Sequence, residues 1–295
     1  MKTMICNLAA LVIALVIALV VVASGAAAKG GPTPDPLLGW DGVKASGGAV
    51  RYVALPAGPH ATTVVAVRVR DGRVLQFGVL PGVLGIPQVA WDGTSDGISA
   101  DGRRLVLASI SSQPIPARTT FVVLHSGTLR TLRTIRLPGL WAFDAISPDG
   151  ATIYALQYGA AADPAHYSVR AIDTISGRIF PGAIVDRREP DEEMRGSPVT
   201  RAWSADREWA FTLYSKPNGT AFVHGLDTTK RNAVCLDLPW RGIGKTIGQV
   251  RLRVSPDGQT LMLHQSGIGR LASVDLSSLV VRSFRPPLAP GVPAS

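Results

Sequence analysis

Cysteine is almost absent from this sequence, which contains only Cys6 and Cys235. Cys6 lies within an apolar N-terminal stretch, so the rest of the chain holds one thiol and cannot form an internal disulfide. This excludes the disulfide-stapled scaffolds of many small secreted domains. The fold must depend on its hydrophobic core, and Cys235, in the apolar stretch NAVCLDL, is predicted to be a small buried residue.

Acidic residues are also scarce. The 21 Asp and Glu are outnumbered by 30 Lys and Arg, which gives a formal net charge of +9 over 295 residues. A basic chain suits anionic surfaces, but here the cations are spread along the sequence. The densest run, RTLRTIR at 130–136, resembles an outer strand and has none of the interleaved aromatic residues on which single-stranded nucleic acids stack. We therefore predict no nucleic-acid partner.

The common catalytic and metal-binding motifs are missing. The sequence has no G-x-S-x-G nucleophile elbow. No two of its five histidines have the spacing of a metal-binding pair. The stretch DGTSDG at 92–97 has the composition of a calcium loop but not the EF-hand spacing. We predict neither a metal nor a cofactor.

One motif is present only in part. The stretch PWRGIGKT at 239–246 ends like the phosphate loop G-x-x-x-x-G-K-[ST]. Pro239 occupies the position of the leading glycine, and the residues after Thr246, IGQVRLRVS, resemble a strand rather than the helix whose N-terminus would bind the phosphate. We interpret this stretch as a flexible loop between two strands, in which Lys245 is a candidate ligand-binding residue at the loop face.

The sequence has a single long hydrophobic run, LAALVIALVIALVVVA at 8–23, and no charge lies between Lys2 and Lys29. Residues 1–28 are therefore predicted to be a secretory signal peptide or an N-terminal membrane anchor. The small residues at 26–28 favour cleavage, whereas the length of the run favours retention. Both alternatives place the remainder outside the cytoplasm, either secreted or anchored to the cytoplasmic membrane.

Helical patterns of ten or more residues are missing after this run, and short strand-like segments repeat instead. SPDG occurs at 147–150 and 255–258, with looser copies at 46–49 (SGGA), 99–102 (SADG) and 204–207 (SADR). Ser can bond back to the backbone, Pro sets the first central turn residue, and Gly tolerates the positive φ that closes a hairpin. One strand-like segment precedes each copy and three follow it, so five repeats of about 50 residues predict an all-β fold. The architecture expected is a single β-propeller of five four-stranded blades.

The repeated S-P-D-G turn resembles that of the TolB-like and YVTN-type propellers, relatives of WD-repeat proteins, over roughly residues 39–287. The resemblance implies an extracytoplasmic bacterial protein with a propeller at 37–287, between a Pro/Gly-rich linker at 29–36 and a tail at 288–295. These families include lactonases, periplasmic scaffolds and receptor-like binding domains, so the resemblance leaves the function open. We expect the strand at 38–46 to close the ring beside the last blade. If the first repeat forms no blade, the ring would be open or would have a different number of blades.

The position three residues before each motif serine is expected to lie on an innermost strand and to face the central channel. It holds Val43, Asp96, Asp144, Arg201 and Leu252. Paired inner-strand carboxylates are used by five-bladed glycosidases as a general acid and as a base or nucleophile. Asp96, Asp144 and Arg201 are therefore candidate catalytic residues. The same groups would serve equally well in an ion pair between blades.

Trp91 and Trp141 lie in or beside the loops that lead into innermost strands. Aromatic rings at such a face bind sugars or proteins, or else pack as a plug over the channel. The sequence thus supports a non-enzymatic binding or scaffold domain for a protein or cell-envelope ligand. The alternative is a glycosidase-like or lactonase-like hydrolase that uses the carboxylates. A third reading is a tethered propeller that spaces envelope components without a small ligand.

Overall fold

The computed structural model describes residues 33–113, 116–159, 166–190 and 194–288, apart from the side chain of Lys245. The chain divides into two units, Met1–Gly31 and Pro32–Ser295, and every described residue belongs to the second. The predicted signal or anchor segment and the residues of the tail after 288 lie outside this description. Within it, no helix has both the length and the apolar character needed to cross a membrane.

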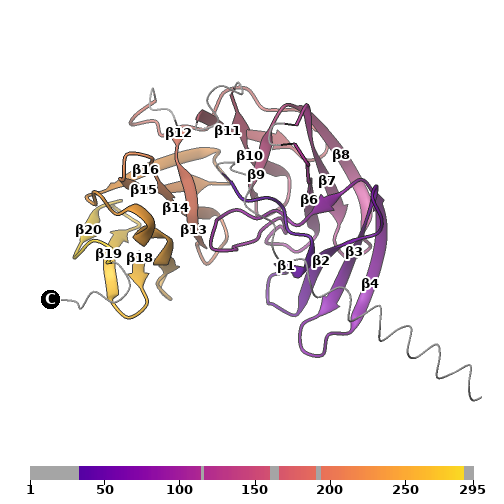
Figure 1. Ribbon diagram of the computed structural model, residues 1–295, viewed down its shortest axis with the longest axis horizontal. Coiled ribbons are helices and arrows are strands. Elements are labelled where there is room, and N and C mark those ends of the chain that lie inside the picture. Colours follow the sequence, from indigo (N-terminus) through magenta and orange to yellow (C-terminus); the bar gives the residue numbers. More distant parts are fainter. Residues whose placement is uncertain (1–32, 114–115, 160–165, 191–193, 289–295) are drawn as a thin grey trace, which may run out of the picture. The chain divides into compact units, whose positions relative to one another are not determined.

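The chain forms five four-stranded antiparallel sheets, each built from strands that are consecutive in sequence (Figure 1). The first contains β1 (Gly39–Lys44), β2 (Val50–Pro56), β3 (Ala61–Arg68) and β4 (Val74–Pro81). The second contains β5 (Leu84–Gly85), β6 (Arg104–Ser109), β7 (Arg118–His125) and β8 (Arg130–Pro138). The third contains β9 (Trp141–Ile146), β10 (Thr152–Tyr158), β11 (His166–Asp173) and β12 (Met194–Arg195). The fourth contains β13 (Ser197–Trp203), β14 (Trp209–Ser215), β15 (Ala221–Asp227) and β16 (Asn232–Leu238), and the fifth β17 (Val250–Val254), β18 (Thr260–Gln265), β19 (Gly269–Asp275) and β20 (Val281–Ser283). This confirms the all-β propeller of five four-stranded blades, and the sheets are called blades 1 to 5 in chain order.

The S-P-D-G turns have the predicted chemistry. In blade 3 the Ser147 hydroxyl donates to the Asp149 carboxylate over 2.6 Å, and the Thr152 N–H donates to the Ser147 oxygen over 2.9 Å. Gly150 has φ +70° and donates its N–H to the Ser147 carbonyl. A left-handed residue therefore closes the turn, as the repeated glycine indicated.

Two predicted strands are wrong. The innermost strand of blade 2 is β5, whereas the segment 95–99 forms only isolated bridges, because Gly97 takes φ +114° and interrupts the extended backbone. The outermost strand of blade 3 is β12, whereas the segment 178–185 forms only isolated bridges to β11. Pro181, within that segment, has no N–H to donate to a ladder.

The loop at 239–246 is also more ordered than predicted. A 3-10 helix, η1 (Gly244–Gln249), follows Ile243, and β17 begins only at Val250. This six-residue helix has no side-chain cap on its first turn. It does not supply the long helix of a phosphate loop.

Four hydrophobic clusters join successive blades. One joins blades 1 and 2 through residues such as Tyr52 and Leu107, the next blades 2 and 3, the third blades 3 and 4, and the last blades 4 and 5. Among the described residues, none of the four contains side chains of both blade 1 and blade 5. The predicted closure is wrong as well, because β1 pairs with β2 and not with β20.

A loop at 88–96, here called the crossing loop, links blade 2 to three other blades, two of which share no hydrophobic cluster with it. The Trp91 and Asp92 N–H groups donate to the carbonyls of Pro198 and Val199 in blade 4, over 3.0 and 3.1 Å. The Ser95 hydroxyl donates to the Gly42 carbonyl of blade 1 over 2.8 Å. Asp92 also lies 3.7 Å from the Arg251 guanidinium of blade 5. The crossing loop therefore connects blade 2 to blades 1, 4 and 5.

Candidate functional site

A row of polar side chains crosses blade 4 on the face that packs against blade 3. In the antiparallel register Arg201 lies opposite Thr212, Thr212 opposite His224, and His224 opposite Cys235. Directly opposite residues of an antiparallel sheet point to the same face. The four side chains therefore run from the innermost strand β13 to the outermost strand β16.

At the inner end of this row, Arg201 forms an ion pair with Asp144 of blade 3. One guanidinium nitrogen contacts the Asp144 carboxylate, another donates to the Asp144 backbone carbonyl, and Nε donates to the Thr212 hydroxyl over 2.8 Å. Both side chains are at most 2 % exposed. Burial alone would lower the pKa of the Arg201 guanidinium. The electrostatic influence of Asp144, Tyr214 and Asp96 is larger and raises that pKa. This is an ion pair between blades.

Asp144 reaches this position through a β-bulge. The consecutive residues Tyr154 and Ala155 of β10 pair with Ala145 and Phe143, so Asp144 is the extra residue of β9. A bulge redirects one side chain out of the regular alternation. It lets the carboxylate approach Arg201 while its neighbours remain in the apolar clusters between blades.

Asp96 lies in the crossing loop and is 1 % exposed. One oxygen accepts the Gly97 N–H over 2.7 Å and lies 3.4 Å from Arg207 Nη2, while the other, Oδ2, is buried without a hydrogen-bond partner. Burial raises the pKa of Asp96, and the opposing influence of Arg207 and Arg201 does not offset it. The structure thus brings Asp96 into the electrostatic neighbourhood of the Asp144–Arg201 pair without a strong partner of its own.

His224, the third member of the row, is 1 % exposed. The Tyr214 ring meets its imidazole edge-on, with 6.2 Å between ring centroids. Burial lowers the pKa of His224 to about 4. The imidazole is therefore neutral at neutral pH.

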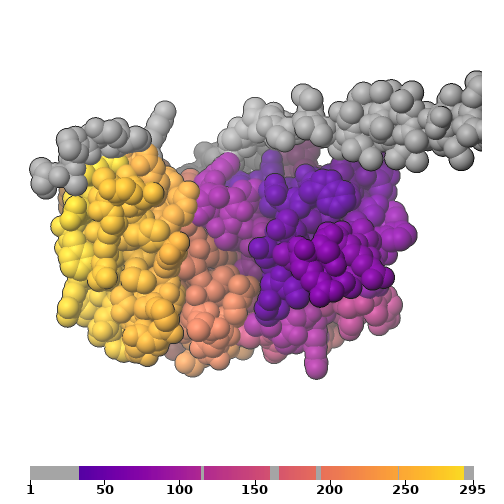
Figure 2. All heavy atoms as spheres, turned by 90° about the horizontal axis from the view of Figure 1, so that it is seen from below, coloured from indigo at the N-terminus to yellow at the C-terminus, as the bar shows by residue number. Residues whose placement is uncertain are grey.

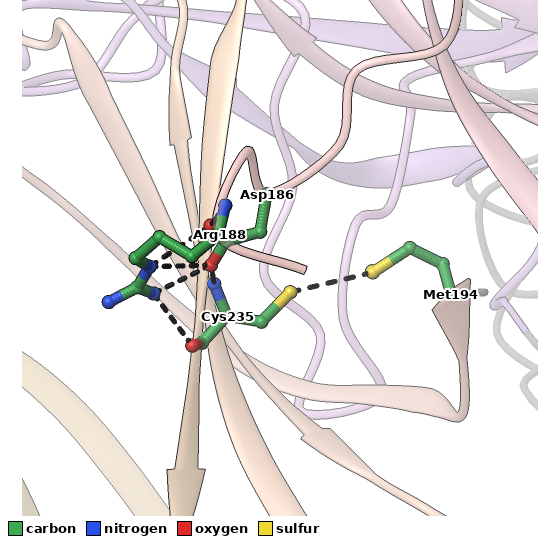
Figure 3. A network of polar contacts seen from close by, with 4 residues as sticks. All are labelled: Asp186, Arg188, Met194 and Cys235. Atoms are coloured by element: carbon green, nitrogen blue, oxygen red, sulfur yellow. Dashed lines mark hydrogen bonds and ion pairs between the residues drawn. The ribbon is translucent and has the colours of Figure 1, made fainter. Parts of the chain in front are cut away.

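A network of charged and sulfur-bearing groups surrounds the outer end of the row (Figure 3). The Arg188 side chain donates to both carboxylate oxygens of Asp186 and to the Cys235 carbonyl, and the Cys235 N–H donates to Asp186 over 2.7 Å. Partial burial alone would raise the pKa of Asp186, but these hydrogen bonds lower it to about 2. The network fixes the segment around Asp186 against the edge strand β16. The sulfur atoms of Cys235 and Met194 face one another at 4.0 Å.

The remaining candidates from the sequence lie in three different elements. Trp91 is 41 % exposed in the crossing loop. Trp141 is buried in the cluster between blades 2 and 3, and its indole donates to the Pro138 carbonyl, so its ring does not meet a ligand at the surface. Lys245 lies in η1, and its side chain is outside the described atoms.

Arg207 is a member of this site that the sequence did not reveal. It takes the place of the turn glycine in SADR, with φ +62°, and its guanidinium lies 4.2 Å from the centre of the Trp203 ring. From there it reaches Asp96 of the crossing loop. The only available signal was its departure from the repeated glycine.

No family model matches this sequence, and no curated protein matches it. Solved structures with a similar chain fold include the hydrazine synthase of Kuenenia stuttgartiensis, with 14% identity and TM-score 0.49 over 90% of this chain and 69% of that one. TolB from Acinetobacter baumannii matches with 17% identity and TM-score 0.41 over 80% of this chain and 52% of that one. The Cps50 (Swd1) propeller domain from Myceliophteria thermophila matches with 10% identity and TM-score 0.44 over 79% and 63%. The chain thus spans between about half and two thirds of the length of these three solved chains, and the likeness concerns the fold alone.

Proposed function

We propose that this protein is a non-enzymatic binding domain for a protein of the cell envelope and acts outside the cytoplasm. In this proposal the N-terminal segment is removed as a signal or retained as an anchor. The observation that carries the proposal is the exposed β4 end of the blade 1 face that is turned away from blade 2. Phe77 and Val79 are exposed there, whereas Val53 and Val65, in the same row as Phe77, are buried.

The alternation of β4 defines this face. A Cβ built on Gly78 would lie 3.6 Å from Leu129 of blade 2, and Leu80 belongs to the cluster between blades 1 and 2. Phe77 and Val79 therefore point the other way. They are 69 % and 62 % exposed. In the space-filling view, the indigo and violet residues of blade 1 form part of the molecular surface (Figure 2).

The charges around this face indicate the kind of partner. Lys44, Arg51, Val67 and Val74 form one row across blade 1, adjacent to the row that ends in Phe77. An apolar patch bordered by cations fits a protein surface that is apolar at its centre and acidic at its rim. A hydrolase would instead need both Asp96 and Asp144 to meet a substrate, and each is at most 2 % exposed.

The test is a photo-crosslinking residue placed at Phe77 in the full chain, expressed at its cell envelope. One crosslinked protein is expected, identified by mass spectrometry and then titrated against the purified chain. Replacing Phe77 and Val79 together by serine should weaken that titrated affinity at least about tenfold, since exposed apolar anchors contribute most of the energy of such contacts.

Ile175→Ser is the matched control, because Ile175 is 68 % exposed in another blade. It should leave the affinity unchanged. The proposal fails if the double variant binds the partner as well as the wild type does. It also fails if the only adduct is a second copy of this chain.

A further inference from the structure

The outermost strands of the blades differ in how their edges are protected. An outermost strand leaves every second backbone N–H and C=O group unpaired, and proteins protect such edges by shortness, charge or a covering segment. β12 and β20 have two and three residues. β8 carries three exposed arginines. β16 is covered by the segment around Asp186, which accepts the Cys235 N–H.

β4, at the edge of blade 1, has none of these protections in the part of the chain that the structure describes (Figure 1). It spans eight residues, Val74–Pro81, and carries no charge. A bulge at Leu75 and the proline at the end of the strand leave the regular stretch 76–80 between them. This stretch is a sheet edge that is open to pairing.

The alternation of hydrogen bonds shows which backbone groups of β4 are directed outward. The Gly82 N–H donates to the His60 carbonyl over 2.7 Å. Hydrogen-bonded and non-hydrogen-bonded pairs alternate in an antiparallel ladder, so every second residue back from Gly82, Gly78 among them, bonds to β3. Phe77 and Val79 have the other parity and direct both their N–H and C=O groups away from β3. No described loop or strand hydrogen-bonds to these outward groups.

A groove of about 590 Å³ lies beside this edge, on the side of blade 1 that faces blade 2. Leu80 and Val122 belong to its apolar lining, and Thr120 and Thr134 add hydroxyl groups. Arg136 of β8 also lines the groove and is exposed. Among the described residues no carboxylate pairs with its guanidinium. The groove therefore combines an apolar lining with an available cation.

We propose that β4 accepts an extended segment of the partner protein as a fifth strand of blade 1. This inference rests on the function proposed above and specifies how that partner binds. The side chains of an added strand alternate between two faces. One set lies beside Phe77 and Val79, and the other enters the groove, where the Arg136 guanidinium binds a carboxylate. In such complexes backbone pairing supplies affinity, and pockets for alternate side chains supply specificity.

The charges identify the occupant as an acidic segment of another protein rather than a second copy of this chain. β4 has no carboxylate to place against Arg136. Two chains that each carry a formal net charge of +9 also repel one another. An apolar segment with one Asp or Glu directed toward the groove complements both faces of the edge.

The test uses the full chain and a fluorescent peptide of eight residues, in which valine and threonine alternate and one central threonine is replaced by glutamate. Binding is measured by fluorescence anisotropy, and one peptide per chain is expected. In the complex the Phe77 and Val79 amides should exchange with solvent at least about tenfold more slowly than in the chain alone, because they then donate hydrogen bonds. Hydrogen exchange followed by NMR measures this.

Two controls separate strand addition from docking of side chains alone. The peptide is N-methylated at one or the other set of alternate residues. One of these two peptides should bind at least about tenfold more weakly, since its methyl groups face β4, and the other should bind as the unmodified peptide does.

Arg136→Gln should weaken binding of the glutamate peptide about fivefold, because it removes a partly exposed ion pair, and should not affect a glutamine analogue of the peptide. Arg133→Gln is the matched variant on the same strand. Arg133 donates to the Ser176 carbonyl of blade 3, so its replacement should change neither affinity.

Several outcomes would overturn strand addition and leave the proposed binding function intact. These are the absence of peptide binding, equal binding by both methylated peptides, and unprotected Phe77 and Val79 amides in the complex. Protection of those amides in a dimer of the chain alone would identify a second copy as the occupant and would also overturn the proposal. Strand addition by the peptide, without any envelope protein crosslinked at Phe77, would instead reject the proposed function and leave the strand site standing.

Discussion

At the scale of single residues, Asp96 and Asp144 are both buried carboxylates with opposite surroundings. Each carboxylate has one oxygen without a hydrogen-bond partner, but the other oxygen of Asp144 contacts the buried Arg201 guanidinium, whereas that of Asp96 accepts one main-chain N–H and lies 3.4 Å from the partly exposed Arg207. Removing one member of a close, buried ion pair lowers the stability of the folded protein. A buried charge without such a partner already lowers that stability, so removing it can raise it. The two residues should therefore respond differently to the same substitution.

Asp96→Asn is expected to stabilise the protein at pH 7 by on the order of 1 kcal/mol, because it removes a poorly compensated buried charge. For a domain of this size, Tm should rise by about 2–4 °C. The folded-state pKa of Asp96 is raised above its unfolded value. Its contribution to the free energy of unfolding is therefore fully present below the unfolded pKa, where the carboxyl is protonated, and is lost as pH rises through the folded pKa. The Tm difference between variant and wild type should thus shrink as pH falls toward 4, measured by thermal denaturation at both pH values.

Asp144→Asn is the matched comparison for that experiment. It leaves the Arg201 guanidinium buried without its counterion, which typically costs about 3–5 kcal/mol. Equal destabilisation by both substitutions would contradict the distinction between the two carboxylates. So would a Tm gain for Asp96→Asn that is the same at pH 4 and pH 7.

The sequence was sufficient to bring Asp144 and Arg201 together and to suggest an ion pair, because the repeated serine aligns the innermost strands of neighbouring blades. It was not sufficient to show the β-bulge that directs Asp144 toward Arg201, since a bulge depends on pairing with β10. It also could not show that Arg207 reaches Asp96, a contact between residues 111 positions apart. Long-range contacts of this kind leave no local pattern.

At the scale of elements, the crossing loop is one part of the fold that the repeat pattern did not predict. The segment 95–99 has the composition of an innermost strand, yet the strand of that blade forms earlier, at Leu84–Gly85. Strand composition describes a half-buried surface, and the segment 95–99 is mostly buried without belonging to a ladder. Burial alone therefore did not distinguish the loop from a strand.

Gly97→Ala, just after the crossing loop, is expected to destabilise the protein by about 2–4 kcal/mol, more than Gly93→Ala within the loop. Both glycines have positive φ, which costs roughly 1–2 kcal/mol for an L side chain. At Gly97 a Cβ would also lie 2.8 Å from the Val106 carbonyl oxygen, whereas at Gly93 it meets nothing within 4 Å. Denaturant unfolding of the two variants measures the difference, and equal free energies of unfolding would contradict the close approach.

At the scale of the whole molecule, the five blades have unequal support. Blades 2, 3 and 4 each share two hydrophobic clusters with neighbours, whereas blades 1 and 5 share one each among the described residues. The outward face of blade 5 is also unlike that of blade 1. One row of side chains across the outward face of blade 5 consists of Arg253, Met262, Ser273 and Arg282. The adjacent row consists of Arg251, His264 and Arg270. An apolar face and a cationic face do not form a shared core.

Blade 5 should therefore open locally more often than the middle blades. We expect the amides of β18 and β19 to exchange with solvent at least about tenfold faster than those of β10 and β14, because local opening free energy follows the number of buried apolar contacts. Hydrogen exchange followed by mass spectrometry at neutral pH measures this. Uniform protection across all five blades would instead indicate that blades 1 and 5 share a packed interface in solution.

The series of four clusters also has a mechanical consequence. A closed ring resists tension because its first and last blades hold each other, so that it yields as a whole once that closure breaks. Here the connections between blade 5 and the early part of the chain include the contact of Arg251 with Asp92 in the crossing loop, a partly exposed ion pair that contributes little. A chain pulled by its two ends would lengthen in steps, losing its terminal blades before its middle ones, and would keep a folded centre under loads that had already unravelled its edges.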